Sequence, residues 1–250
     1  MIAPEASAVA KLAEEGDPER FLFAQLAPAE DREGLFALIA FNCELAKIPV
    51  SVSEPMLGEI RLAWWREALD DLFEKGVTRR HEVMEALAAS LARAEWDRDL
   101  LAGMIDARLY SLEGLPANPA EAGTFIEDTA GAYHRLAVGA LGGRSADAQE
   151  VAGAVGWAEG AGRLVAALSQ EAEARGEQDE LAATLTALRD QARAKLADAR
   201  SRRSAAPRAA RAPLGSVYFA EAAINDVSPP DQASLRERLR LGWRMATKRF

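Results

Sequence analysis

The stretch from Val52 to Leu69 reads VSEPMLGEIRLAWWREAL, and its pattern predicts an amphipathic helix over residues 55–75. Pro55 suits the first turn of a helix, where the missing N–H costs nothing, and Gly76 suits the C-terminal end. Between them apolar side chains recur at steps of three or four residues. The positions that we expect to form a core-facing stripe are Leu57, Ile60, Trp64, Ala68 and Leu72.

The placement of the 11 prolines extends this prediction to the whole chain. Residues 56–115 and 120–206 contain no proline and are rich in good helix formers, and no segment has a convincing strand pattern. Helices are expected near residues 29–48, 55–75, 80–93, 97–113, 120–141, 146–170, 179–204, 214–224 and 231–248. Short loops between successive helices predict one all-α domain over residues 1–250, with a flexible N-terminus over residues 1–17.

The composition excludes several classes of protein. The 250 residues include 30 Lys and Arg against 39 Asp and Glu, and the net charge of −9 argues against a nucleic-acid partner. Cys43 is the single cysteine, which excludes a disulfide framework and a cysteine-based zinc site. The longest uninterrupted apolar runs, 35–41 and 151–158, are shorter than the about 18 residues of a spanning helix. The first 19 residues lack a signal-peptide pattern, so a cytoplasmic location is expected.

The net charge hides a gradient along the chain. Residues 189–250 hold 14 Lys and Arg against 6 Asp and Glu, whereas the preceding part is acidic. A basic amphipathic terminal helix is expected over residues 231–250. One interpretation is a surface for an acidic partner or for peripheral contact with an anionic inner membrane, formed by Arg236, Arg240, Trp243 and Arg244. The alternative is a helix that packs its apolar stripe on the bundle and leaves its arginines solvated.

Residues that often carry chemistry favour structural roles here. Gly156, Gly160 and Gly162 follow no strand, so they indicate close helix packing rather than a nucleotide-binding loop. His134 has no acid or cysteine at ligand spacing, which favours a hydrogen-bonded helical histidine over a metal ligand. Cys43 lies on an apolar helix face and is expected to be a small core residue.

Two pairs of charged residues have the i, i+4 spacing that a metal site on a helix would use. Asp70 and Glu74 lie four residues apart at a helix end, where a solvated face is favoured over a magnesium site. Glu171 and Arg175 have the same spacing but opposite charge, which favours a salt bridge.

Several segments resemble the squalene/phytoene synthase family, in particular its short divergent branch, whose mitochondrial members assist the assembly of respiratory complex I. The segments are residues 20–24 (RFLFA), 35–42 (LFALIAFN), 52–69, 105–108 (IDAR) and 129–132 (TAGA). The resemblance implies an isoprenoid-synthase-like helical bundle around a central cavity. Active members join two prenyl diphosphates head to head, with Mg²⁺ held by two aspartate-rich helical motifs, because a leaving diphosphate needs neutralisation by divalent cations.

The chain departs from the family pattern at the metal-binding motifs. The three aspartate positions of the first motif match Ala46, Lys47 and Val50, and a further family aspartate matches Ser111. In the second motif only Glu171 remains as a carboxylate. The resemblance therefore implies no catalytic residue and no metal ligand. The residues left as candidates for the cavity wall are Asn42, Lys47, Arg61, Tyr133 and Glu171.

Three functions remain open from the sequence. We favour a non-catalytic assembly or interaction factor with a protein partner, such as a subunit of respiratory complex I. The first alternative is a head-to-head prenyltransferase, which would require Mg²⁺ as the cofactor. The second is a helical protein that binds a lipid or a quinone in the inherited cavity.

Overall fold

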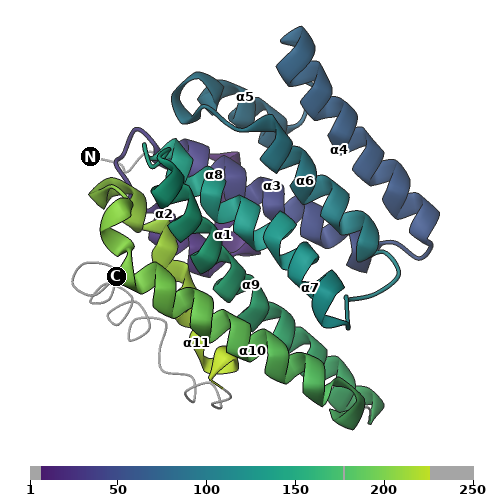
Figure 1. Cartoon of the computed structure of the whole chain (residues 1–250). Helices are drawn as coiled ribbons and strands as arrows, with labels where there is room; N and C mark the ends of the chain where they lie inside the picture. Colours follow the sequence, from purple (N-terminus) through teal and green to yellow (C-terminus); the bar gives the residue numbers. More distant parts are fainter. Residues whose placement is uncertain (1–6, 177, 226–250) are drawn as a thin grey trace.

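The computed structural model describes residues 7–176 and 178–225, which form a helical bundle with no strand in these ranges (Figure 1). The α-helices are α1 (Ala8–Gly16), α2 (Pro18–Ala24), α3 (Arg32–Ser51), α4 (Pro55–Lys75), α5 (Glu82–Ala94), α6 (Arg98–Tyr110), α7 (Pro119–Ile126), α8 (Ala132–Ala140), α9 (Ala146–Arg175), α10 (Gln178–Ser201) and α11 (Val217–Ile224). The shorter turns are the π-helical η1 (Glu127–Gly131) and the 3-10 turns η2 (Arg203–Ala205), η3 (Arg208–Arg211) and η4 (Pro213–Ser216). The all-α prediction is confirmed.

Helix α3 lies at the centre of the first half of the bundle. Its residues from Gly34 to Cys43 are all buried, and α1, α2, α4, α5, α6 and α8 pack against it. Its length and composition would allow it to cross a membrane, although 61% of that stretch is buried inside the fold, as in a core helix. Polar residues such as Asn42 interrupt its apolar runs, so a search for uninterrupted runs does not find it.

Helix α9 organises the second half. It packs against α10, α11, α8 and η1, and Figure 1 shows α10 alongside it. The glycines on α9 allow this close packing, because a Cβ at Gly156 would lie 2.4 Å from the Ala130 carbonyl oxygen of η1. A Cβ at Gly162 would lie 2.7 Å from the Ala220 carbonyl oxygen of α11. The packing role predicted for these glycines is confirmed.

The N-terminal region differs from the expectation of a flexible segment over residues 1–17. The Ser7 side chain accepts a hydrogen bond from the Ala10 amide at 3.1 Å and caps α1. Val9 and Ala13 are buried, and α1 packs against α3. A short apolar stripe thus packs this helix against α3, although the region is rich in acidic residues. The basic helix expected over residues 231–250 lies outside the described residues.

The C-terminal part of α4 buries the predicted stripe, including Trp64, which packs against the core, whereas its N-terminal part buries a different face. Ala68 and Leu72 are buried as expected, but Leu57 is 45% exposed and Ile60 is 61% exposed. The buried stripe consists of Gly58, Leu62, Trp65, Ala68, Leu69 and Leu72. Both stripes have helical spacing, so only the packing partners decide between them. Gly58 faces the Leu112 side chain, which sets the helix against the end of α6 and turns Ile60 outward.

The contact between α9 and η1 gives a stability test. We expect Gly156→Ala to lower the free energy of unfolding by about 1–3 kcal/mol, because its Cβ would clash with a backbone carbonyl. The control is Gly103→Ala in α6, where a Cβ would meet no atom within 4 Å. There the gain in helix propensity should stabilise the fold by about 0.5–1 kcal/mol. Urea unfolding followed by circular dichroism measures both, and equal effects would contradict the packing role.

Candidate functional site

A buried ionic cluster forms where α2 meets α9. Glu159 of α9 is fully buried, and its Oε1 accepts hydrogen bonds from Nε of Arg20 and Nε of Arg163, each at 2.9 Å. Asp17, also buried, caps α2 through the Arg20 amide at 3.0 Å and lies 3.2 Å from Arg163 Nη2. Glu19 reaches the same Nη2 at 3.3 Å. The two arginines are therefore fully paired with carboxylates.

The other oxygen of Glu159 holds the cluster to the second half of the bundle. Ser216 of η4 donates its hydroxyl to Glu159 Oε2 at 2.5 Å, and His134 Nε2 of α8 lies 2.5 Å from the same oxygen. The His134 Nδ1 atom is buried without a hydrogen-bond partner among the described residues, which fits a neutral ring that donates from Nε2. The Arg20 guanidinium lies over the Tyr133 ring, and its central carbon is 3.9 Å from the ring centre.

The pKa values of the cluster follow from its burial and its charges. Burial raises the pKa of Glu159, but Arg20, Arg163 and His134 outweigh burial and hold this pKa well below its ordinary value. Burial lowers the pKa of His134 despite the nearby Glu159. The result is an ionised carboxylate between two guanidinium groups with a neutral imidazole. Since the carboxylate, the imidazole and Ser216 are closed to solvent, the cluster joins four elements rather than meeting a substrate.

A cavity of about 240 Å³ lies beside this cluster. Its lining residues come from α2, α3, α6, the loop between α6 and α7, α7, η1 and α9 and include Arg20, Asn42, Ala46, Arg108, Phe125 and Arg163. The Arg108 Nη2 atom donates to Asn42 Oδ1 at 3.3 Å, and its guanidinium lies 5.4 Å from the Phe125 ring centre. Nε of Arg108 is buried with no hydrogen-bond partner among the described residues. The wall of the cavity is thus cationic.

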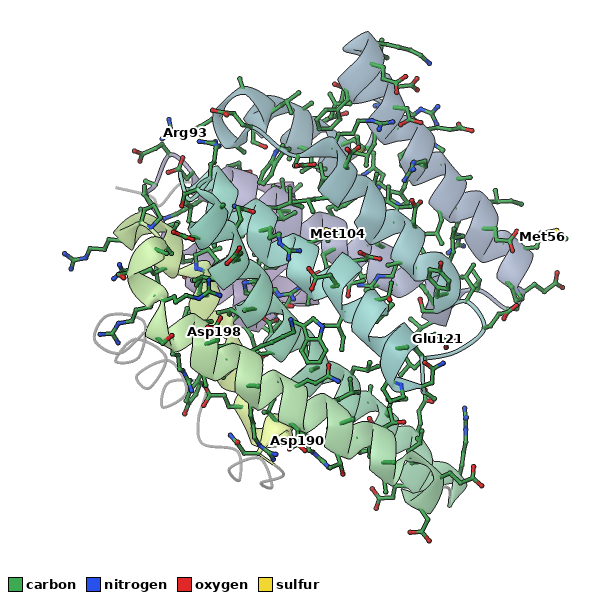
Figure 2. The ribbon with its side chains drawn as sticks, in the orientation of Figure 1. Met56, Arg93, Met104, Glu121, Asp190 and Asp198 are labelled. Atoms are coloured by element: carbon green, nitrogen blue, oxygen red, sulfur yellow. The ribbon has the colours of Figure 1, made fainter. Side chains whose placement is uncertain are left out.

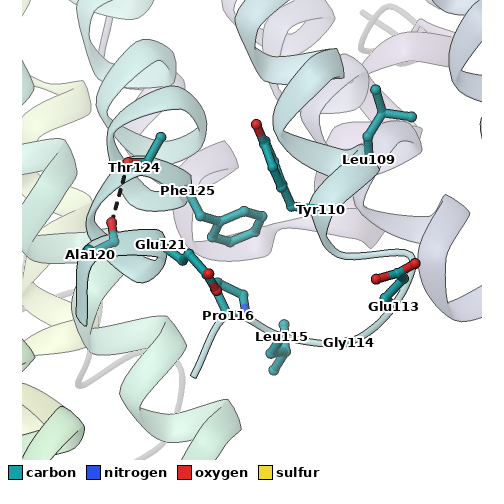
Figure 3. A pocket seen from close by; sticks show the side chains of 10 residues that line it. All are labelled: Leu109, Tyr110, Glu113, Gly114, Leu115, Pro116, Ala120, Glu121, Thr124 and Phe125. Atoms are coloured by element: carbon teal, nitrogen blue, oxygen red, sulfur yellow. Dashed lines mark hydrogen bonds between the residues drawn. The ribbon is translucent and has the colours of Figure 1, made fainter. Parts of the chain in front are cut away.

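A larger pocket of about 650 Å³ opens next to the cavity (Figure 3). Leu115 and Phe125 line both spaces, so one wall is common to them. Figure 3 shows the rings of Tyr110 and Phe125 on opposite sides of the opening. The remaining lining residues are Leu109, Glu113, Gly114, Pro116, Ala120, Glu121 and Thr124.

Of the five residues suggested for the cavity wall, two lie at the cavity or beside it. Asn42 lines the cavity, and Tyr133 lies in the buried cluster beside it. The other three candidates lie away from the cavity. Lys47 is exposed and pairs with Glu44 at 2.7 Å; Arg61 is exposed and donates to Ser51 Oγ at 3.0 Å. Glu171 forms the predicted pair with Arg175, at 3.8 Å. Each of the three lies on a helix face that turns outward, which spacing along the chain did not reveal.

The residues at this site do not fit a magnesium–diphosphate centre. Ala46 lies on the cavity wall, whereas Lys47 points to the surface and Val50 is 85% exposed. Three guanidinium groups line the cavity and no carboxylate does, which is the reverse of the donor set that Mg²⁺ needs. No group of three His, Cys, Asp or Glu in residues 7–176 and 178–225 could hold a metal ion.

The acidic pair of α4, Asp70 and Glu74, forms salt bridges. Arg98 of α6 donates to Asp70 at 2.5 Å and to Glu74 at 3.2 Å. These salt bridges tie α4 to α6, in agreement with a structural role.

The hydrogen-bonded role predicted for His134 is confirmed, whereas the sequence pattern assigned no role to Arg20, Glu159 or Ser216. Arg20 and Arg108 were quoted as parts of family segments, but neither was assigned a role. Glu159 is the one charged residue between Val151 and Ala161, an otherwise apolar face of a long helix. A lone carboxylate in such a position signals a buried partner, since unpaired buried charges are costly. The identity of that partner, 139 residues away, is set by the fold.

The cluster makes the fold sensitive to one carboxylate. We expect Glu159→Gln to lower the free energy of unfolding by about 3–5 kcal/mol, because Arg20 and Arg163 would lose their shared buried anion. The matched control is Glu150→Gln on the same helix, since Glu150 is exposed and pairs with Arg202 on the surface. Calorimetry should show a large fall in Tm for the first variant and little change for the second; similar Tm values would contradict the role of the cluster.

The cluster also predicts a pH dependence of stability. The pKa of His134 is lowered from 6.5 in the fold, so below this pH the unfolded chain takes up a proton that the folded chain does not. The free energy of unfolding should therefore fall as the pH drops through about 6.5, and fall again below about 4.5 as the unfolded Glu159 becomes protonated. Urea titrations across this range measure the slope. His81→Gln, which removes the other histidine, should keep it, and a stability independent of pH would contradict the prediction.

Comparisons with known proteins agree with the fold and the sequence segments. The family model described as squalene/phytoene synthase matches residues 13–161. Proteins named NADH dehydrogenase (ubiquinone) complex I, assembly factor 6 are 32% identical in Bos taurus and 30% identical in Homo sapiens, over 145 residues. Each match covers 58% of this chain and 43% of the relative.

A solved structure extends the similarity to nearly the whole chain. A dehydrosqualene synthase crystallised with a ligand superposes with a TM-score of 0.69, covering 96% of this chain and 94% of the other. At 12% identity this likeness shows the fold alone. The fold is that of the isoprenoid synthases, and the family match over residues 13–161 identifies the chain as a member of the squalene/phytoene synthase family.

Proposed function

We propose that this chain is a non-catalytic member of the squalene/phytoene synthase family that assists the assembly of respiratory complex I. Support comes from the relatives, which are named assembly factors of that complex. The similar part spans less than half of their length, so the role of the whole relatives is carried to this chain as a proposal.

The observation that carries the non-catalytic part is the chemistry of the cavity wall. The helix position that matches a family aspartate is Ala46, and Arg20, Arg108 and Arg163 line the same space. A diphosphate leaving group needs divalent cations, which these side chains would repel. The prenyltransferase alternative would require ligands from residues outside 7–176 and 178–225.

An exposed apolar surface supports a protein partner. The large apolar side chains exposed at the start of α4 and nearby are Val50, Met56, Leu57 and Ile60, together with Leu109 and Tyr110 at the end of α6. Gly58 packs on Leu112, which brings these two helix ends together, and Figure 2 shows Met56 at the outer end of α4. Large apolar side chains exposed on adjoining helix ends are typical of a contact site for another protein. We call this set of side chains the α4 surface.

The location of the protein is part of the proposal. A protein that assists a respiratory complex works beside the membrane, which agrees with a cytoplasmic protein that contacts the inner membrane peripherally. The basic residues suggested for that contact, Arg236, Arg240, Trp243 and Arg244, lie outside the described residues and remain a prediction. Liposome flotation should require anionic lipid and weaken with added salt; flotation unchanged by charge reversal at Arg236, Arg240 and Arg244 would reject this contact.

Complementation tests the assembly role. Membranes from a strain without the gene should show reduced NADH:ubiquinone oxidoreductase activity, which the parent sequence restores. Ile60→Glu should fail to restore it, because a charge at the centre of the α4 surface opposes apolar contact, while the purified variant keeps its Tm. The control is Glu59→Gln, one residue away on an exposed position. Normal activity in the deletion strain would overturn the assembly role.

An enzyme assay tests the alternative. Purified protein with farnesyl or geranylgeranyl diphosphate and Mg²⁺ should give no condensed product above a heat-denatured sample. Product that forms with Mg²⁺ and disappears with a chelator would establish the prenyltransferase instead.

A further inference from the structure

Arg108 has no carboxylate partner in the part of the chain that the structure describes. Its contacts in the described residues are the Asn42 amide oxygen and the face of Phe125, and its Nε is buried without a partner. Burial and then the like charge of Arg20 lower the pKa of Arg108 to about 10, and no carboxylate opposes them. A guanidinium kept in such a place costs stability unless a ligand supplies the missing charge.

The neighbouring arginines define how much charge a ligand would carry. Arg20 and Arg163 are already paired with Asp17 and Glu159, which leaves one unpaired guanidinium at the cavity. A single negative charge matches it. A diphosphate would bring two or more further charges close to Glu159 and Asp17, with no added cation on the lining to offset them. A carboxylate also fits the planar fork of a guanidinium.

The surroundings indicate that the ligand carries an apolar chain. The rest of the cavity lining is largely apolar, with Leu115, Phe125, Ala130, Leu164 and Ala167. Leu115 and Phe125 continue into the outer pocket, where Leu109, Tyr110 and Pro116 extend the apolar surface (Figure 3). A chain that starts at Arg108 can therefore follow one apolar wall to the surface.

We propose that the cavity and the outer pocket together bind a fatty acid, with its carboxylate on Arg108 and its chain along Phe125 and Leu115 toward Tyr110. This binding would be independent of Mg²⁺ and does not rest on the assembly role. It accounts for the buried unpaired Nε and for the wall that the two spaces share.

Calorimetric titration of lipid-stripped protein tests the proposal. Dodecanoate should bind at least tenfold more tightly than dodecanol, and equally well with or without a chelator. Affinity should rise with chain length from butanoate, by about fourfold for each methylene that becomes buried. Farnesyl diphosphate without Mg²⁺ should bind more weakly than dodecanoate. Equal affinity for the acid and the alcohol, or tighter binding of the diphosphate, would overturn the proposal.

Variants separate binding from folding. Arg108→Met should weaken dodecanoate binding at least tenfold and leave the Tm of the ligand-free protein unchanged or higher, because a buried unpaired charge is removed. Arg108→Lys should retain the preference for the acid over the alcohol. The control is Arg66→Met, which removes a surface arginine of α4 that pairs at 2.8 Å with Asp106 of α6, the helix that carries Arg108, and should bind as the parent does.

The Tm and the affinity are read together. A lower Tm in Arg108→Met, together with equal affinity of the parent for dodecanoate and dodecanol, would assign Arg108 a structural role and reject the ligand. Unchanged affinity in Arg108→Met would do the same. These outcomes do not bear on complex I activity in the deletion strain, so the two proposals fail separately.

Discussion

The ionised carboxylate of Glu159 is the constraint around which this bundle is arranged. It is fully buried and binds side chains from α2, α8, α9 and η4, so four elements must be in place before its charge is compensated. A buried charge without partners is far more costly than any single apolar contact is favourable. The cluster therefore specifies one arrangement of the two halves of the bundle. Apolar packing between α3 and its neighbours alone would tolerate small shifts.

The same cluster determines what the cavity can hold. By pairing Arg20 and Arg163 with Glu159 and Asp17, it leaves Arg108 as the cavity arginine that has no carboxylate partner among residues 7–176 and 178–225. In a fold shared with a dehydrosqualene synthase, the wall next to α3 carries Ala46 and Asn42 where a metal site would need carboxylates. Three arginines line this space, where a Mg²⁺ site would need carboxylates. Such a space suits a ligand of one negative charge better than a metal-bound diphosphate.

Much of the fold could be predicted because helices are encoded locally. Prolines, caps and apolar periodicity placed α4 at its observed bounds and α5 and α6 within three residues of theirs. The glycines of α9 were assigned to packing for the right reason. At the start of α4 the predicted positions Leu57 and Ile60 were wrong, since two apolar stripes of helical spacing run along this helix. The contact between Gly58 and Leu112, a residue that follows α6, decides which stripe is buried.

By itself the sequence determined the helical class, the family segments and the loss of aspartates at Ala46, Lys47 and Val50, because each of these is a property of residues near one another in the chain. Only the tertiary structure decided that Lys47, Arg61 and Glu171 face outward, and that Arg20, His134, Glu159 and Ser216 meet. These contacts join residues 25 to 139 positions apart and depend on how the helices pack, which the periodicity of any single helix does not determine. The unpaired charge of Arg108 is likewise a property of the space around it, and only the assembled bundle creates that space.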